Sequence, residues 1–208
     1  DPSSSEAVIW TRATNTVAAS PLALIAQVAP DDPTLTTGVV TFDVSTDPAR
    51  DYTAKLVLSN LLAGTRYYYR FVNASNPAHA SIVGTFKTAP HANAAAPVRF
   101  AFGGDADGLM RPYALASIFP SLGLDFFVFD GNTVYETASA FSGAAALTGT
   151  IPSPSSSGAT QLQLFNDYSR KNREQFIAVN SGGQKCLQPL FAAQGNYTLL
   201  NNHELGDR

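Results

Sequence analysis

Residues 62–71 read Leu62-Ala63-Gly64-Thr65-Arg66-Tyr67-Tyr68-Tyr69-Arg70-Phe71, a turn followed by a segment rich in aromatic side chains. Gly64 marks the turn. Because successive side chains of a strand point to opposite faces, Tyr67, Tyr69 and Phe71 share one face. We predict that this face belongs to the core of a β-sheet protein, so that the aromatic residues are structural and do not form a ligand-binding surface.

The segments on either side of this stretch also alternate with a period of two. The predicted strands are 7–12, 22–28, 39–44, 52–58 and 82–87, separated by Pro, Asp and Gly clusters such as Pro30-Asp31-Asp32-Pro33. Short strands at regular spacing without a helical period between them predict a β-sandwich over residues 1–90. Residues 62–71 resemble the corner of fibronectin type III domains, in which a tyrosine hydroxyl fixes the turn before the strand.

The second half of the chain has a different pattern, which begins after a proline-flanked, alanine-rich linker at residues 91–97. Residues 98–102 and 125–129 are near-continuous apolar strands, as expected in a sheet that is buried on both faces. We predict helices at 112–119 and 162–177 and a final strand at 197–200. This alternation of strands and helices predicts an α/β arrangement.

Composition excludes several function classes. Charged residues make up 14% of the chain, against about 25% in an average soluble protein, and such low charge is typical of secreted and periplasmic proteins. The net charge of −3 provides no basic surface for a nucleic acid. The single cysteine, Cys186, cannot form an intrachain disulfide. No apolar run reaches the roughly 18 residues that a membrane span needs.

Polar residues follow each of the apolar strands in the second half. They are Asp105 and Asp107, then Asp130-Gly131-Asn132, then Asn201-Asn202-His203-Glu204. Ligands of open α/β sheets collect outside the carboxyl ends of strands. Oxygen and nitrogen donors from three such ends are what a two-metal hydrolytic site requires. Each motif alone is equally compatible with an ordinary turn, and their shared position at strand ends is what favours a metal site.

The chain resembles the PhoD-type alkaline phosphatases and phosphodiesterases, which join an N-terminal β-sandwich to a metallophosphoesterase domain. The segments that carry the resemblance are 7–12, 65–71, 83–90, 98–102, 124–136 and 202–204. The implied organisation is a fibronectin type III-like β-sandwich at 1–90, a linker at 91–97, and the first part of an α/β metallophosphoesterase sandwich at 98–208.

The resemblance also implies site residues and cofactors. Asp105 stands where the family places a ligand of the iron ion. Asn132 and Tyr135 correspond to the bridging aspartate and the iron-binding tyrosine, with Glu136 following. Asn202 matches a further metal ligand, and His203 would face the phosphate as an acid or charge stabiliser. The implied metals are iron and calcium in a dinuclear or larger centre.

Two features depart from the family pattern. Asn132 is neutral, whereas a ligand shared by two cations needs an anion, and Asn201 also replaces the more usual aspartate. A degenerate site that binds no metal and an aspartate misread as asparagine both remain open interpretations. The remaining metal histidines of the family have no counterpart, because His79 and His91 fall in the sandwich and the linker. We therefore expect that the site is not completed within these 208 residues.

The sequence thus predicts a phosphoesterase that hydrolyses phosphate mono- or diesters and is periplasmic or extracellular. The expected partner is a phosphate ester substrate. The sequence predicts no nucleic acid partner and no membrane span. The alternatives are a non-catalytic secreted or surface binding protein with a degenerate phosphoesterase domain, and a fragment without activity. Whether the chain is an enzyme, and its oligomeric state, stay open at this level.

Overall fold

The structure is a computed structural model that describes residues 2–14, 20–106, 113–135, 147–148, 165–177, 179–180 and 186–204. Chain contacts divide it into two compact units. Unit 1 comprises Asp1–Val98 with Ala192–Gly195, and unit 2 comprises Arg99–Phe191 with Asn196–Arg208. Within the described residues, no helix combines the length and apolarity needed to cross a membrane.

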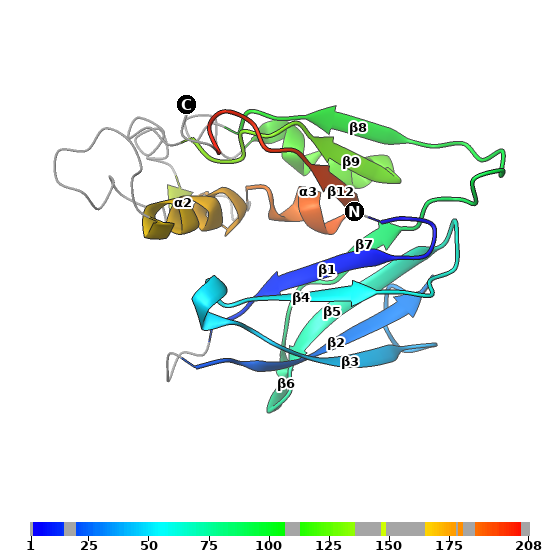
Figure 1. The fold of residues 1–208 in the computed structure, drawn as a ribbon, viewed down its shortest axis with the longest axis horizontal. Coiled ribbons are helices and arrows are strands. Elements are labelled where there is room, and N and C mark those ends of the chain that lie inside the picture. Colours follow the sequence, from blue (N-terminus) through cyan, green and yellow to red (C-terminus); the bar gives the residue numbers. More distant parts are fainter. Residues whose placement is uncertain are drawn as a thin grey trace. The chain divides into compact units, whose positions relative to one another are not determined.

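Unit 1 is built from two antiparallel sheets (Figure 1). Its strands are β1 (Ala7–Arg12), β2 (Ala23–Pro30), β3 (Val40–Ser45), β4 (Thr53–Leu58), β5 (Arg66–Asn73), β6 (Asn76–Ala80) and β7 (Gly84–Lys87), with a 3₁₀ turn η1 (Pro48–Arg50) between β3 and β4. One sheet pairs β1 with β4, and the other has the order β3-β2-β5-β6 with β7 also on β5. Each strand predicted in this half is present, whereas β6 was not predicted.

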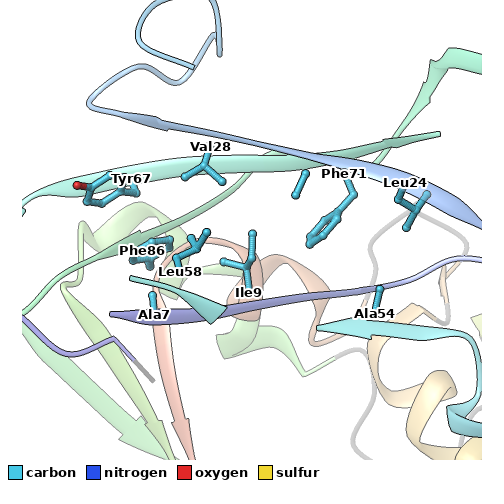
Figure 2. Close-up of a cluster of buried hydrophobic side chains, with 10 residues drawn as sticks. Ala7, Ile9, Leu24, Val28, Ala54, Leu58, Tyr67, Phe71 and Phe86 are labelled. Carbon is cyan, nitrogen blue, oxygen red and sulfur yellow. The ribbon is translucent and has the colours of Figure 1, made fainter. Parts of the chain in front are cut away.

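The core of unit 1 lies between these two sheets. Figure 2 shows Val28, Phe71 and Leu24 facing Ile9 and Ala54 of the opposite sheet. Tyr67 and Phe71 are buried, and the Tyr69 ring packs edge-on against Phe71. Burial raises the pKa of Tyr69 to about 12. The aromatic face predicted for residues 67–71 is therefore part of the core of a two-sheet sandwich.

The turn before β5 is held by side-chain hydrogen bonds. The Leu62 N–H donates to the Tyr67 hydroxyl at 2.9 Å. The buried Thr88 hydroxyl donates to the Leu62 carbonyl at 2.6 Å and accepts from the Thr65 N–H at 2.9 Å. A tyrosine hydroxyl thus binds the backbone a few residues upstream, as in tyrosine corners of other β-sandwiches.

The loop between β2 and β3 is organised by one carboxylate. Asp32 accepts hydrogen bonds from the N–H groups of Thr34, Thr36 and Thr37 at 2.7–2.8 Å. A hydrogen bond from the Thr34 hydroxyl and then those backbone groups hold the pKa of Asp32 well below its usual value. This carboxylate therefore stabilises the folded state only while it is ionised.

We expect the stability of unit 1 to change less as the pH is lowered in Asp32→Asn than in wild type. Because the folded pKa lies below the unfolded one, the contribution of Asp32 is complete above the unfolded pKa and is lost as the pH falls through the folded pKa. The variant should unfold at lower urea than wild type at about pH 7, and the gap should narrow toward about pH 3. Fluorescence of Trp10, the single tryptophan, reports the unfolding of β1.

The control for this measurement is Asp31→Asn. It removes the same charge from the neighbouring position, and the Asp31 side chain makes none of the threonine hydrogen bonds. A difference in urea midpoint between wild type and Asp32→Asn that stays the same at every pH would contradict the lowered pKa of Asp32.

Unit 2 is described around a three-stranded sheet of order β12-β9-β8. Its elements are β8 (Phe100–Gly103), 3₁₀ turns η3 (Ala114–Ser117) and η4 (Phe119–Leu122), β9 (Phe126–Phe129), β10 (Leu147–Thr148), α2 (Phe165–Ile177), β11 (Val179–Asn180), α3 (Gln188–Ala192) and β12 (Gly195–Thr198). β8 and β9 are parallel, with Phe100 opposite Phe126. Phe127 and Phe129 of β9 pack in a core with Leu187 and Leu190.

Three local features differ from the sequence prediction. The predicted helix at 112–119 is described from Tyr113 onward as two 3₁₀ turns, η3 and η4. Pro120 lies inside η4, where an α-helix could not continue through it. β10, β11 and α3 were not predicted. The last strand ends at Thr198, so that Leu199 and Leu200 are exposed beyond it.

Candidate functional site

The three strand ends that carry polar motifs lie next to one another. The Asp105 N–H donates to the Gly131 carbonyl at 3.2 Å, and the Ala106 N–H donates to the Asn132 carbonyl at 2.9 Å. The Leu199 N–H donates to the Phe129 carbonyl at 2.9 Å. These backbone bonds join the loop after β8 to the loop after β9, and the last residue of β9 to the segment after β12. The convergence predicted from the sequence is therefore present.

The Asp105 carboxylate is the centre of the site. Its Oδ1 accepts a hydrogen bond from Asn132 Nδ2 at 2.8 Å and another from the Tyr135 hydroxyl at 3.0 Å. The Asn132 amide, then the Tyr135 hydroxyl, and to a smaller extent the nearby His203, hold the pKa of Asp105 below its usual value. Asp105 is exposed and ionised at neutral pH, so it presents a negative charge at this edge of the sheet.

His203 is attached to the same group of side chains. Its imidazole stacks on the Tyr135 ring with the centroids 4.0 Å apart and the planes at 29°. Its backbone N–H donates to Asn132 Oδ1 at 3.2 Å. Both ring and backbone are thus fixed by residues of the preceding strand end, while the side chain remains only half-buried.

Glu204 holds the two later loops together, a role that the sequence motif did not reveal. Its Oε2 accepts from the N–H groups of Asn132 and Asn201, each at 2.9 Å. Its Oε1 accepts from the Thr133 N–H, from the Thr133 hydroxyl at 2.9 Å and from the Val134 N–H at 3.4 Å. Partial burial raises the pKa of Glu204, but these hydrogen bonds together lower it below its usual value. The carboxylate therefore serves as a structural anion.

A second set of side chains supports the site from the direction of α2. The Ala106 carbonyl accepts from Gln175 Nε2 at 2.5 Å and from the Tyr113 hydroxyl at 2.9 Å. Gln175 is fully buried, as are Lys171 and Glu174 on the same helix. The sequence predicted only a polar helix here. Periodicity alone does not show whether the polar side chains of such a helix are buried or face the solvent.

Of the residues predicted to form the site, Asp105, Asn132, Tyr135 and His203 contact one another directly. Asn202 lies on the same turn and is exposed, with its N–H donating to Asn201 Oδ1 at 2.8 Å. Asp107 and Glu136 lie outside the described residues. His79 and His91 are exposed in unit 1, on β6 and in the segment after β7.

The donor set fits one cation and does not fit two. Asp105 and Tyr135 bring a carboxylate and a phenol oxygen to one point, which suits a hard cation. Position 132, where two cations would share an anion, carries an amide whose NH₂ faces Asp105. Among the residues that the structure describes, no group of three or more His, Cys, Asp or Glu side chains is arranged to hold a metal ion.

Comparison with known proteins gives a family match in the first half of the chain. Residues 1–90 match the family described as "PhoD-like phosphatase, N-terminal domain". No curated protein matches the sequence.

Two solved structures share the fold over nearly the whole chain. PhoD is 21% identical with a TM-score of 0.71, and the match covers 98% of this chain and 38% of PhoD. The purple acid phosphatase PPD1 from yellow lupin (Lupinus luteus) seeds is 13% identical with a TM-score of 0.53, covering 96% of this chain and 33% of that one. This chain therefore spans less than two fifths of the length of either. The family match thus applies to residues 1–90, and the two solved structures show a shared fold.

Proposed function

We propose that this chain, whose residues 1–90 are a PhoD-like phosphatase N-terminal domain, is the N-terminal portion of an enzyme that hydrolyses phosphate mono- or diesters with the help of metal ions. Its fold matches PhoD over 98% of its length. The proposed domains are a fibronectin type III-like sandwich at 1–90, a linker at 91–97 and part of a metallophosphoesterase domain at 98–208. We also propose a periplasmic or extracellular location.

One observation carries this proposal. Asp105, Asn132, Tyr135 and His203 come from three separate strand ends and are joined by direct contacts into one cluster. An ordinary turn explains each motif alone, but it does not explain why an ionised carboxylate, a phenol and an imidazole meet. Such a meeting point beyond the carboxyl ends of strands is where ligands bind in open α/β sheets.

Each side chain has a proposed role in phosphate ester hydrolysis. Asp105 and Tyr135 would hold a cation, with Asn202 as a weaker neutral ligand. A bound iron or calcium ion supplies Lewis-acid polarisation of the phosphoryl oxygen. His203 faces the phosphate and donates a hydrogen bond or a proton to an oxygen that gains charge during the reaction. Glu204 keeps His203 in place by binding Asn132 and Asn201.

The test is hydrolysis and binding by the purified chain. Hydrolysis of p-nitrophenyl phosphate and bis(p-nitrophenyl) phosphate is measured with iron and calcium present, and binding of inorganic phosphate is measured by calorimetry. We expect His203→Ala to lower hydrolysis by about 100-fold, the lower end of what a positioned acid contributes, and to weaken phosphate binding. His91→Ala is the matched control, because His91 is an exposed histidine outside the site. Absence of both hydrolysis and phosphate binding in wild type would overturn the proposal.

A second candidate is a non-catalytic surface or secreted protein that binds phosphate esters through a degenerate site. The amide at position 132 favours it, because this group cannot serve as an anion between two cations. Phosphate binding that depends on His203 without measurable hydrolysis would support this candidate over the enzyme.

A further inference from the structure

We infer that Asn132 takes the place of a cation beside Asp105, so that residue 132 decides whether this protein holds its site together with a hydrogen bond or with a metal ion. The inference rests on the proposed function in one respect, namely that Asp105, Asn132 and Tyr135 belong to a metal-binding site. Its test uses metal binding and stability, neither of which requires hydrolysis.

The orientation of the Asn132 amide is determined by its two partners. Nδ2 lies 2.8 Å from Asp105 Oδ1, and Oδ1 lies 3.2 Å from the His203 backbone N–H. An ionised carboxylate can only accept and a backbone N–H can only donate. Rotating the amide by half a turn would place oxygen against oxygen and N–H against N–H. The amide is therefore the donor toward Asp105.

Asn132 is also held in place by its surroundings. Its side chain is buried, and its backbone N–H and carbonyl bind Glu204 and Ala106. Its φ of 57° lies in the left-handed region, which asparagine and aspartate adopt more readily than other non-glycine residues. An aspartate would fit the same backbone conformation, so the difference between the two residues is confined to the donor that faces Asp105.

An aspartate at position 132 would put two carboxylates at hydrogen-bond distance without a proton donor between them. Like charges this close are unfavourable unless a cation neutralises both. In the present chain there is only one carboxylate, and the amide stabilises it by donating an N–H group to Asp105, with the Tyr135 hydroxyl as another donor. Wild type should thus be stable without metal and bind it more weakly than Asn132→Asp, whose stability should depend on metal.

The experiment compares wild type and Asn132→Asp in calcium-free buffer and in millimolar Ca²⁺. Without Ca²⁺ we expect the melting temperature of the variant to fall by about 2–8 °C in a chain of this size. With Ca²⁺ the variant should recover, while wild type changes little. Terbium luminescence excited through tyrosine should show at least about tenfold tighter binding of Tb³⁺ by the variant, equivalent to about 1.4 kcal/mol.

Asn201→Asp is the matched control. It adds the same charge to the same edge of the sheet, but the Asn201 side chain contacts the Asp130 carbonyl and the Asn202 N–H and makes no described contact with Asp105. It should reproduce neither the loss of stability nor its rescue by Ca²⁺. Equal effects of both variants, or equal metal affinity of wild type and Asn132→Asp, would overturn the inference. Either result would leave the phosphate-binding test of His203 unaffected.

Discussion

Phe71→Ala is expected to cost unit 1 about 3–5 kcal/mol, the usual range for removing a buried phenylalanine. Phe71 is 3% exposed and belongs to the cluster that joins the two sheets of the sandwich. Its ring packs edge-on against Tyr69 with the centroids 6.1 Å apart. Alanine would leave a cavity between the two sheets. Since small domains are stable by only about 5–15 kcal/mol, this loss would remove a large part of the stability of the unit.

Trp10 makes this effect measurable, because the single tryptophan of the chain lies on β1 of the same unit. Urea unfolding followed by its fluorescence should shift to a much lower midpoint. Val57→Ala is the control: Val57 lies on β4 and is 63% exposed, so its truncation should change stability by no more than about 0.5 kcal/mol. A midpoint for Phe71→Ala as high as that of Val57→Ala would refute the assignment of Phe71 to the core.

Gly131→Ala is expected to have the second large effect, by separating the strand ends that form the candidate site. Gly131 has a φ of 90°, and a Cβ there would lie 2.6 Å from Asn201 Cβ and 3.0 Å from Asn201 N. Backbone strain of about 1–3 kcal/mol would add to overpacking of about 1–3 kcal/mol. The least costly response is movement of the Asn201–Glu204 turn away from β9, which would break the hydrogen bonds of Glu204.

Gly123→Ala separates these two causes. Gly123 has a φ of 62°, but a Cβ there would meet only Arg99 Nη1 at 3.8 Å. Gly123→Ala should therefore lose stability through backbone strain without moving the Asn201–Glu204 turn. Hydrogen exchange of the Asn132, Thr133 and Asn201 amides, which bind Glu204, is the direct measurement. Protection of those amides in Gly131→Ala equal to that in Gly123→Ala would contradict the predicted displacement.

Much of unit 1 could be predicted from the sequence because its signals are local. Alternation of side chains and Pro, Asp and Gly clusters predicted each of its strands except β6, which follows β5 after a short turn and has only exposed residues. The resemblance to PhoD-type phosphatases is likewise confirmed, by a family match over residues 1–90 and by the shared fold with PhoD. The fibronectin type III-like description, the domain boundaries and the metal ligands stay predictions.

The sequence predicted which residues form the candidate site, but it did not predict the contacts that hold them together. Strand-end position sufficed to select Asp105, Asn132 and His203, since residues at the carboxyl ends of neighbouring strands lie at one edge of a sheet. Tyr135 was added by the resemblance to PhoD-type phosphatases. The roles of Glu204 and Gln175 could not be predicted in this way. The partners of Glu204 at residues 132–134 lie 70–72 positions away in the chain, and Ala106 lies 69 positions from Gln175. No local pattern records which backbone groups a distant side chain will meet.

The sequence by itself determined the sandwich, the family resemblance and the neutral residue at position 132, because strand alternation, turn residues and side-chain identity are written along the chain. Only the tertiary structure decided what Asn132 does. From the sequence, an amide in place of an aspartate was simply a missing negative charge. In the folded protein the same amide donates to Asp105 and accepts from His203. Hydrogen-bond direction depends on which groups the fold brings within about 3 Å.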